Sequence, residues 1–132
     1  MTTHTPYSVW KRREADFVVD YELDPCDELK SAKPCQGMRV DFLYEGDDPK
    51  LDGIHMIWPE LLDSDGQVIL EVAPGLMEVR GRANMWIVDD RRRSYHAARI
   101  KVGARGYWVR GGYRLARVAV VEVLSLRTTA HG

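Results

Sequence analysis

The segment from Arg99 to Leu126, RIKVGARGYWVRGGYRLARVAVVEVLSL, decides the fold. β-branched and aromatic residues run up to Gly111-Gly112 and away from it again. A glycine pair supplies the positive φ angles that a tight hairpin turn needs, so the segment predicts two antiparallel strands. The second strand, from Arg114 to Leu126, is apolar on both faces. Such a strand requires a closed barrel or a covered sheet around it.

Short stretches of the same kind precede this hairpin. They lie at residues 15–23, 38–44, 54–58, 67–72 and 82–88, and Pro25, Pro59 and Pro74-Gly75 interrupt them. Residues 89–98 have helical or irregular character. Short strands separated by frequent turn signals are typical of all-β architectures. We therefore expect a closed or nearly closed antiparallel barrel of six to seven strands at 15–128, with a polar N-terminal arm at 1–14 and a tail at 129–132.

The chain has 132 residues, enough for a single domain with its own core. Its N-terminus has no apolar segment after the basic residues, and no apolar run approaches the roughly 20 residues of a membrane span. We expect a cytoplasmic protein without a membrane partner. Cys26 and Cys35 fit neither a redox motif nor a zinc site, so we expect two thiols, with a disulfide as the alternative after export.

Charge is distributed unevenly along the chain. Residues 1–66 hold 7 Lys or Arg against 15 Asp or Glu, whereas residues 67–132 hold 12 against 5. Two interpretations follow. Strands from the two halves could alternate in the sheet and form ion pairs. Alternatively, the second half presents a basic surface to an acidic protein or a nucleic-acid backbone.

Three segments, in order, resemble the C-terminal (third) β-barrel domain of elongation factor Tu. The first is Gly37-Met38-Arg39-Val40-Asp41-Phe42, similar to a glycine-tyrosine-arginine-proline-glutamine-phenylalanine strand of that family. The second runs from Pro74-Gly75 through Ala83, Met85 and Ile87. The third is Tyr107-Trp108-Val109-Arg110, Gly111-Gly112 and the return strand.

The resemblance implies a stand-alone barrel that takes part in translation. In the family this barrel contacts the T arm of aminoacyl-tRNA, the exchange factor and the GTPase domain. Our chain has no G-x-x-x-x-G-K-[ST] loop to bind phosphates, so the resemblance does not imply a GTPase or a bound nucleotide. It implies RNA, tRNA among the candidates, or a protein of the translation machinery as partner.

Basic and aromatic residues of the second half form the candidate binding site. Arginine can contact phosphate through two N–H groups, and aromatic rings can stack on unpaired bases. The alternative is an ion-paired, solvated face. The predicted RNA- or partner-binding residues are Arg91, Arg92, Arg93, Arg99, Lys101, Arg105, Arg110, Arg114, Tyr95 and Tyr113.

No motif predicts catalysis or a cofactor. His55 lies near Asp52 and Glu60, but we expect a half-buried strand histidine there. The carboxylates between Glu45 and Asp52 lack the spacing of a calcium-binding loop. We therefore predict a non-catalytic binding module without a cofactor or metal. The alternative is an inhibitor or immunity-type protein that caps a protein partner by mimicking the barrel.

Overall fold

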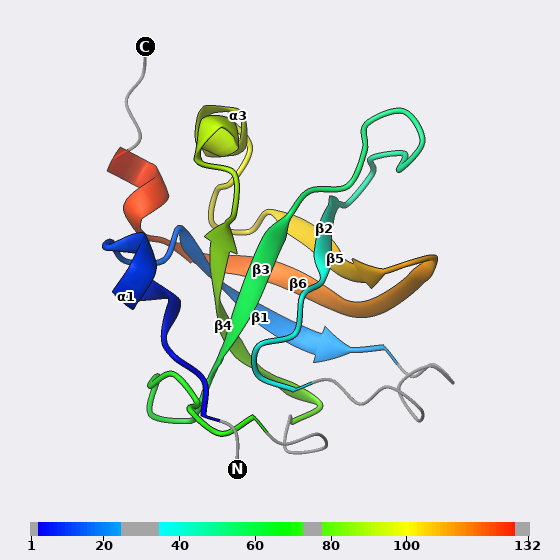
Figure 1. Ribbon diagram of the computed structural model, residues 1–132. Coiled ribbons are helices and arrows are strands. Elements are labelled where there is room, and N and C mark those ends of the chain that lie inside the picture. Colours follow the sequence, from blue (N-terminus) through cyan, green and yellow to red (C-terminus); the bar gives the residue numbers. More distant parts are fainter. Residues whose placement is uncertain (1–2, 25–34, 73–77, 129–132) are drawn as a thin grey trace.

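The computed structural model describes residues 3–24, 35–72 and 78–128. Six strands form one antiparallel sheet in the order β2-β5-β6-β1-β4-β3. Figure 1 shows this sheet with the short helices at its margins. The strands are β1 (Phe17–Leu23), β2 (Asp41–Tyr44), β3 (Ile57–Leu62), β4 (Arg80–Ile87), β5 (Arg105–Arg110) and β6 (Tyr113–Val123).

The predicted hairpin is confirmed as β5 and β6. The two strands pair from Arg105↔Ala119 to Arg110↔Tyr113, and the turn lies at Gly111-Gly112. Gly111 has φ 59°, a left-handed conformation that side chains disfavour. β6 is the longest strand of the sheet, and it pairs with β5 on one side and β1 on the other.

β1 lies between β6 and β4, so a strand from the acidic half of the chain is flanked by two strands from the basic half. The alternation of buried and exposed side chains along β1 agrees with the alternation of apolar and polar residues in its sequence. Phe17, Val19 and Tyr21 are buried in the main core, and Asp20 and Glu22 lie on the opposite face. The same core contains Phe42 of β2 and the fully buried Trp108 of β5.

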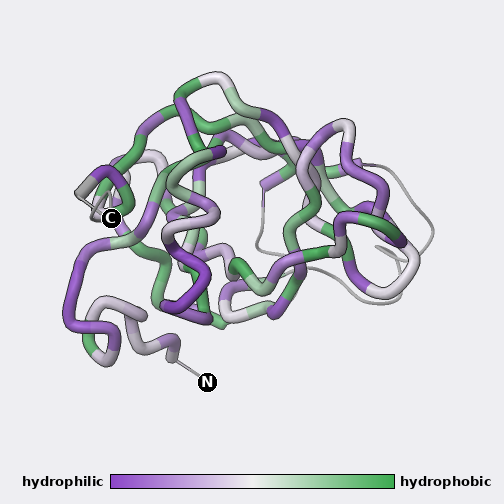
Figure 2. Tube along the Cα trace, turned by 90° about the horizontal axis from the view of Figure 1, so that it is seen from above, coloured by the Kyte–Doolittle hydropathy of each residue, from purple (hydrophilic) through white to green (hydrophobic). Residues whose placement is uncertain are grey.

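The expected all-β fold of six or seven antiparallel strands is confirmed with six strands. The sheet curls into a half-barrel without closing, so the expectation of a closed or nearly closed barrel is wrong. Viewed from above, the trace bends around one axis (Figure 2). The edge strands β2 and β3 are not paired along their length; a single bridge joins Phe42 to His55, just before β3. β2 has only four residues. At the other edge the Gln36 side chain takes the place of a partner strand, because it bonds both the N–H and the C=O of Leu61.

The third strand begins and ends later than predicted, because Pro59 lies inside β3 instead of ending it. Pro59 is paired in register with Met85 of β4. The Met85 carbonyl points away from β3, because it accepts a hydrogen bond from the Asp16 N–H on the β1 side of β4. The Pro59 nitrogen therefore points to the open edge of the sheet, where no ladder bond is lost. Residues 67–72 are not a strand; within the described chain they give only the isolated bridges Leu62↔Val68 and Thr3↔Glu71.

Helical turns cover the margins of the sheet. They are α1 (Tyr7–Lys11), η1 (Asp90–Arg92), α3 (Arg93–Ala97) and η2 (Ser125–Thr128). The N-terminal arm is tied to the outer face of β3 and β4 by Glu60, which is 1% exposed. The Glu60 carboxylate pairs with His4 at 2.6 Å and accepts from the Tyr7 N–H at 2.9 Å and the Trp86 indole at 3.1 Å. Tyr7 is buried by this contact, while Trp10 remains exposed.

Candidate functional site

The outer face of β4, β1 and β6 is a ladder of ion pairs. Acidic side chains of β1 alternate with arginines of both neighbouring strands. Asp20 pairs with Arg82 at 2.9 Å, and Glu22 pairs with Arg80 at 2.8 Å and also with Arg117. Asp24, just after β1, pairs with Arg114 at 2.7 Å. The charge asymmetry of the sequence is thus largely compensated between neighbouring strands on this face.

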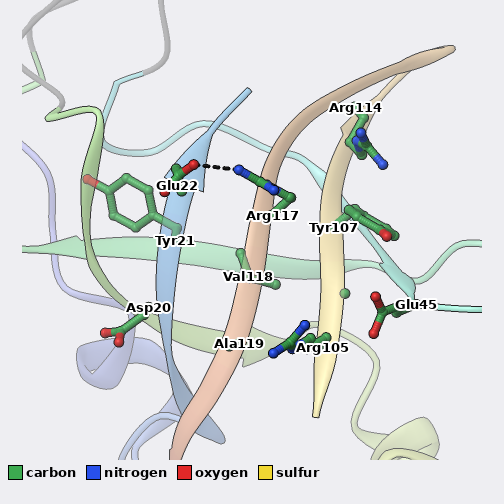
Figure 3. Close-up of a pocket in the computed structure, with 11 residues that line it drawn as sticks. Asp20, Tyr21, Glu22, Glu45, Arg105, Tyr107, Arg114, Arg117, Val118 and Ala119 are labelled. Atoms are coloured by element: carbon green, nitrogen blue, oxygen red, sulfur yellow. Dashed lines mark hydrogen bonds and ion pairs between the residues drawn. The ribbon is translucent and has the colours of Figure 1, made fainter. Parts of the chain in front are cut away.

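A groove of about 580 Å³ lies on this face, and we call it the hairpin groove. It is lined by residues 20–22, 105–107 and 117–119 together with Glu45 and Arg114. Figure 3 shows Arg105, Arg114 and Arg117 in it, with Glu22 joined to Arg117. Three carboxylates, of Asp20, Glu22 and Glu45, accompany these three arginines. Because the three carboxylates balance the three arginines, this groove is close to electrically neutral. The predicted residue Arg114 also lies over Tyr107, with 4.6 Å between its guanidinium carbon and the ring centroid.

Arg93, one of the predicted binding residues, holds the fold together. Its Nε donates to Asp16 at 2.8 Å, and Asp16 is fully buried. The same carboxylate accepts from the Ile87 N–H at 2.7 Å and pairs with Arg13 at 3.1 Å. A buried carboxylate that retains its charge needs such partners. Arg93 therefore links α3 to the residue before β1 through its bond with Asp16, and its Nε is not available to a ligand.

This role predicts a contrast between two aspartates. D16N should lower the free energy of unfolding by about 3 kcal/mol or more, because it leaves Arg93 and Arg13 without their buried partner. D20N is the matched control: its pair with Arg82 is exposed, and its loss should cost less than about 1 kcal/mol. Urea unfolding of the two variants measures both values. Equal losses would contradict the assignment of Arg93 to the core.

Arg99, another predicted binding residue, is also engaged. Its guanidinium forms two hydrogen bonds with the Asp47 carboxylate, at 2.8 and 2.9 Å. It further donates to the Tyr95 hydroxyl at 2.9 Å and lies 3.8 Å from the centroid of the Tyr44 ring. The Arg99 hydrogen bond lowers the pKa of Asp47, and Asp47 in turn raises the pKa of Arg99. Arg99 and Tyr95 thus fasten α3 to the loop after β2.

Two histidines lie beneath this contact. His96 of α3 shares a hydrogen bond of 2.7 Å between its Nδ1 and the Tyr44 hydroxyl, and its ring meets that of His55 edge-on at 4.8 Å. Burial is the main cause that lowers the pKa of His96 to about 3, with His55, Arg92 and Arg99 adding repulsion. Burial likewise lowers the pKa of His55, whose Nε2 has no hydrogen-bond partner among the described residues. The expected half-buried strand histidine is in fact almost fully buried, just before β3.

The His96 environment predicts a pH dependence of stability. Between pH 6.5 and about 3, the unfolded chain binds a proton at residue 96 that the folded chain excludes, so stability falls as the pH drops. H96N retains a polar atom for Tyr44 but cannot titrate. The stability advantage of wild type over H96N should shrink from pH 7 to pH 4 by at most about 1.4 kcal/mol per pH unit. Denaturation at several pH values checks this, and a constant difference would refute it.

The remaining predicted residues are dispersed. Arg91 is exposed and pairs with Asp89 at 3.0 Å, and Arg92 lies 4.8 Å over the Tyr95 ring. Lys101, Arg105 and Arg110 form no ion pair with a carboxylate in the part of the chain that the structure describes. Tyr113 is exposed beside the hairpin turn. The structure does not gather the ten predicted residues into one site.

A second groove lies near the open edge of the sheet, and we call it the seam groove. It has a volume of about 560 Å³ and is lined by residues 3–5 and 35–39 together with Tyr7, Trp10, Trp58, Val72 and Arg110. Three aromatic rings and two arginines, Arg39 and Arg110, thus face one concavity. Among the described residues, no Asp or Glu lines it. Judged by their described lining, the two grooves differ in charge, because carboxylates offset the arginines of the hairpin groove and none does so in the seam groove.

Arg39 is the cation best placed in the seam groove. Its guanidinium carbon lies 4.8 Å from the centroid of the Trp58 ring, a cation–π distance. Within the described ranges it donates no hydrogen bond and pairs with no carboxylate. The contact with Trp58 therefore positions the charge and leaves its N–H groups available to a ligand.

Among the residues that line this groove, the sequence predicts only Arg110 as a binding residue. It predicts Arg39 in a strand and Tyr7 and Trp10 in a polar arm, because nothing in the local pattern brings residues 3–10 beside residues 35–39 and 58. The one feature of the sequence that indicates this groove is the presence of two aromatic residues, Tyr7 and Trp10, in an otherwise polar arm. The free thiol of Cys35 also lines the groove, and Cys26 lies outside the described residues.

Comparisons with protein-family models, curated proteins and solved structures give no match for this chain. No helix in the described ranges is long and apolar enough to span a membrane. Over the same ranges, no three His, Cys, Asp or Glu side chains come together as metal ligands would. The carboxylates of the loop after β2 accept hydrogen bonds from its own backbone, as Asp48 does from Lys50 and Asp52 from Asp48.

Proposed function

We propose that this chain is a non-catalytic RNA-binding module of the cytoplasm, and that the RNA backbone docks at the seam groove. The observation that carries the proposal is the pair Arg39 and Arg110 in a groove whose described lining contains no carboxylate. Phosphate contacts by arginine supply most of the sequence-independent affinity for nucleic acid. A groove whose own carboxylates balance its arginines offers that backbone little net attraction.

Arg110 joins this groove to the predicted binding surface. It ends β5 beside the glycine turn, and Tyr113 begins the return strand. Lys101, which has no carboxylate partner in the described chain, adds positive charge before β5. Arg105 lines the hairpin groove and is not counted toward this surface. Our proposal retains the likeness to the elongation factor Tu barrel, and with it an RNA of the translation machinery such as tRNA.

A protein partner at the hairpin groove is the second candidate. The observation that favours it is the near balance of three arginines and three carboxylates there. Mixed charge of this kind gives specificity toward a protein surface with the complementary pattern. An inhibitor or immunity-type protein would use such a face.

The test is fluorescence anisotropy with a labelled RNA stem–loop that carries a single-stranded tail. Two phosphate contacts predict a slope of log affinity against log salt of about −1.4 to −1.8. R39A and R110A should each remove about half of that slope and weaken binding, because each removes one contact. R114A/R117A is the matched control, since it removes two arginines that are already ion-paired.

Circular dichroism and thermal unfolding verify that each variant is folded. Absence of binding at 50 mM salt would refute RNA binding. If R114A/R117A weakens binding and R39A and R110A have no effect, the seam groove is refuted as the RNA site. The RNA would then bind at the hairpin groove.

A further inference from the structure

We propose that the seam groove selects unpaired nucleotides of single-stranded RNA, with a base stacked on the Trp10 indole and neighbouring phosphates bound by Arg39 and Arg110. This inference rests on the proposed RNA binding and adds to it the structural state of the RNA. The evidence for this inference is the aromatic side chains of the seam groove, whereas the evidence for RNA binding is the positive charge of the groove.

Trp10 is the exposed member of this aromatic group. Trp10 as a residue is 59% exposed, although tryptophan is large and apolar. Trp108 and Trp86 are buried, and Trp58 is half-buried beneath Arg39. Trp10 meets Tyr7 edge-on, with 5.5 Å between ring centroids and 86° between ring planes. An edge-to-face contact uses at most one face of the indole, so a second flat face remains available for stacking.

The backbone that carries Trp10 is fixed at both ends. Before it, Glu60 holds His4 and the Tyr7 N–H. After it, the Lys11 ammonium donates to the Val88 carbonyl at 3.0 Å and pairs with Asp90 at 3.1 Å. Arg13 pairs with the same Asp90 at 3.2 Å. The stacking platform is therefore largely ordered before a ligand arrives, which reduces the entropy lost on binding.

Charge and aromatic surface occur together in this groove. Arg39 lies over Trp58, and Arg110 lines the same concavity as Trp10. A cationic groove with exposed aromatic rings is the arrangement that binds single strands, because every base offers a flat π face. Bases within a duplex are stacked on one another and cannot meet the indole. The groove should therefore distinguish unpaired from paired RNA. An acidic peptide would satisfy the arginines but would leave the Trp10 face without a planar partner.

The experiment compares three labelled probes of equal length: a single strand of mixed sequence, the same strand annealed to its complement, and an abasic strand with the same phosphates. Wild type should bind the single strand about tenfold more tightly than the abasic strand, since one stacked base contributes about five- to 150-fold in affinity. W10A should lose that preference and bind all three probes with similar affinity. W10F, which keeps a stacking ring, should retain most of it.

The outcomes separate this inference from the proposed function. Equal wild-type affinity for the three probes, or unchanged selectivity in W10A, would overturn base stacking while leaving RNA binding intact. No binding to any probe would overturn both. Displacement of the single strand by an acidic peptide at an equal or lower concentration would also overturn the inference, because a partner without bases would then fit the groove better. V9A, also on α1 and exposed, is the matched control and should leave selectivity unchanged.

Discussion

The pairing of β1 with both β4 and β6 sets the charge pattern of the outer face and the composition of the core. It brings Asp20, Glu22 and Asp24 of the acidic half against arginines of the basic half, so the outer face of the central strands is compensated. The same pairing points the side chains of Phe17, Val19 and Tyr21 toward the core. Each exposed ion pair adds little stability by itself, but like charges facing one another across the strands would be unfavourable.

This arrangement determines where positive charge remains accessible. Arginines of β4 and β6 face carboxylates of β1, and Arg93 and Arg99 are held by Asp16 and Asp47. Arg39 and Arg110, which have no carboxylate partner in the described chain, lie near a margin of the sheet. There they meet the aromatic residues of the N-terminal arm, which Glu60 attaches to β3 and β4. The sheet is open on this side because β2 and β3 are not paired along their length, and the single bridge from Phe42 reaches His55, just before β3.

Much of the fold could be predicted from sequence, because it depends on local patterns. Alternation placed Phe17 and Val19 inside, and the Gly111-Gly112 pair predicted the hairpin. Pro59 predicts the end of a strand but lies inside β3, because the effect of proline on a strand depends on which edge its nitrogen faces, and only the sheet order determines that edge. Closure was overestimated for a similar reason: the short β2 and the Gln36 side chain that occupies the β3 edge are tertiary features.

The candidate site could be predicted only in part. A run of arginines indicates charge, but whether a carboxylate neutralises it depends on contacts as distant as Arg114 with Asp24 or Arg93 with Asp16. The seam groove joins residues 3–10, 35–39, 58 and 110, and no sequence window contains them together.

RNA binding at the seam groove is tested by mapping backbone and indole NMR shifts during titration with a single-stranded RNA. The largest changes should occur at the Trp10 indole and at the amides of residues 37–39 and 110, with little change along β1 and β6. Changes centred on Arg114, Arg117 and the outer face of β1, with none at Trp10, would contradict it.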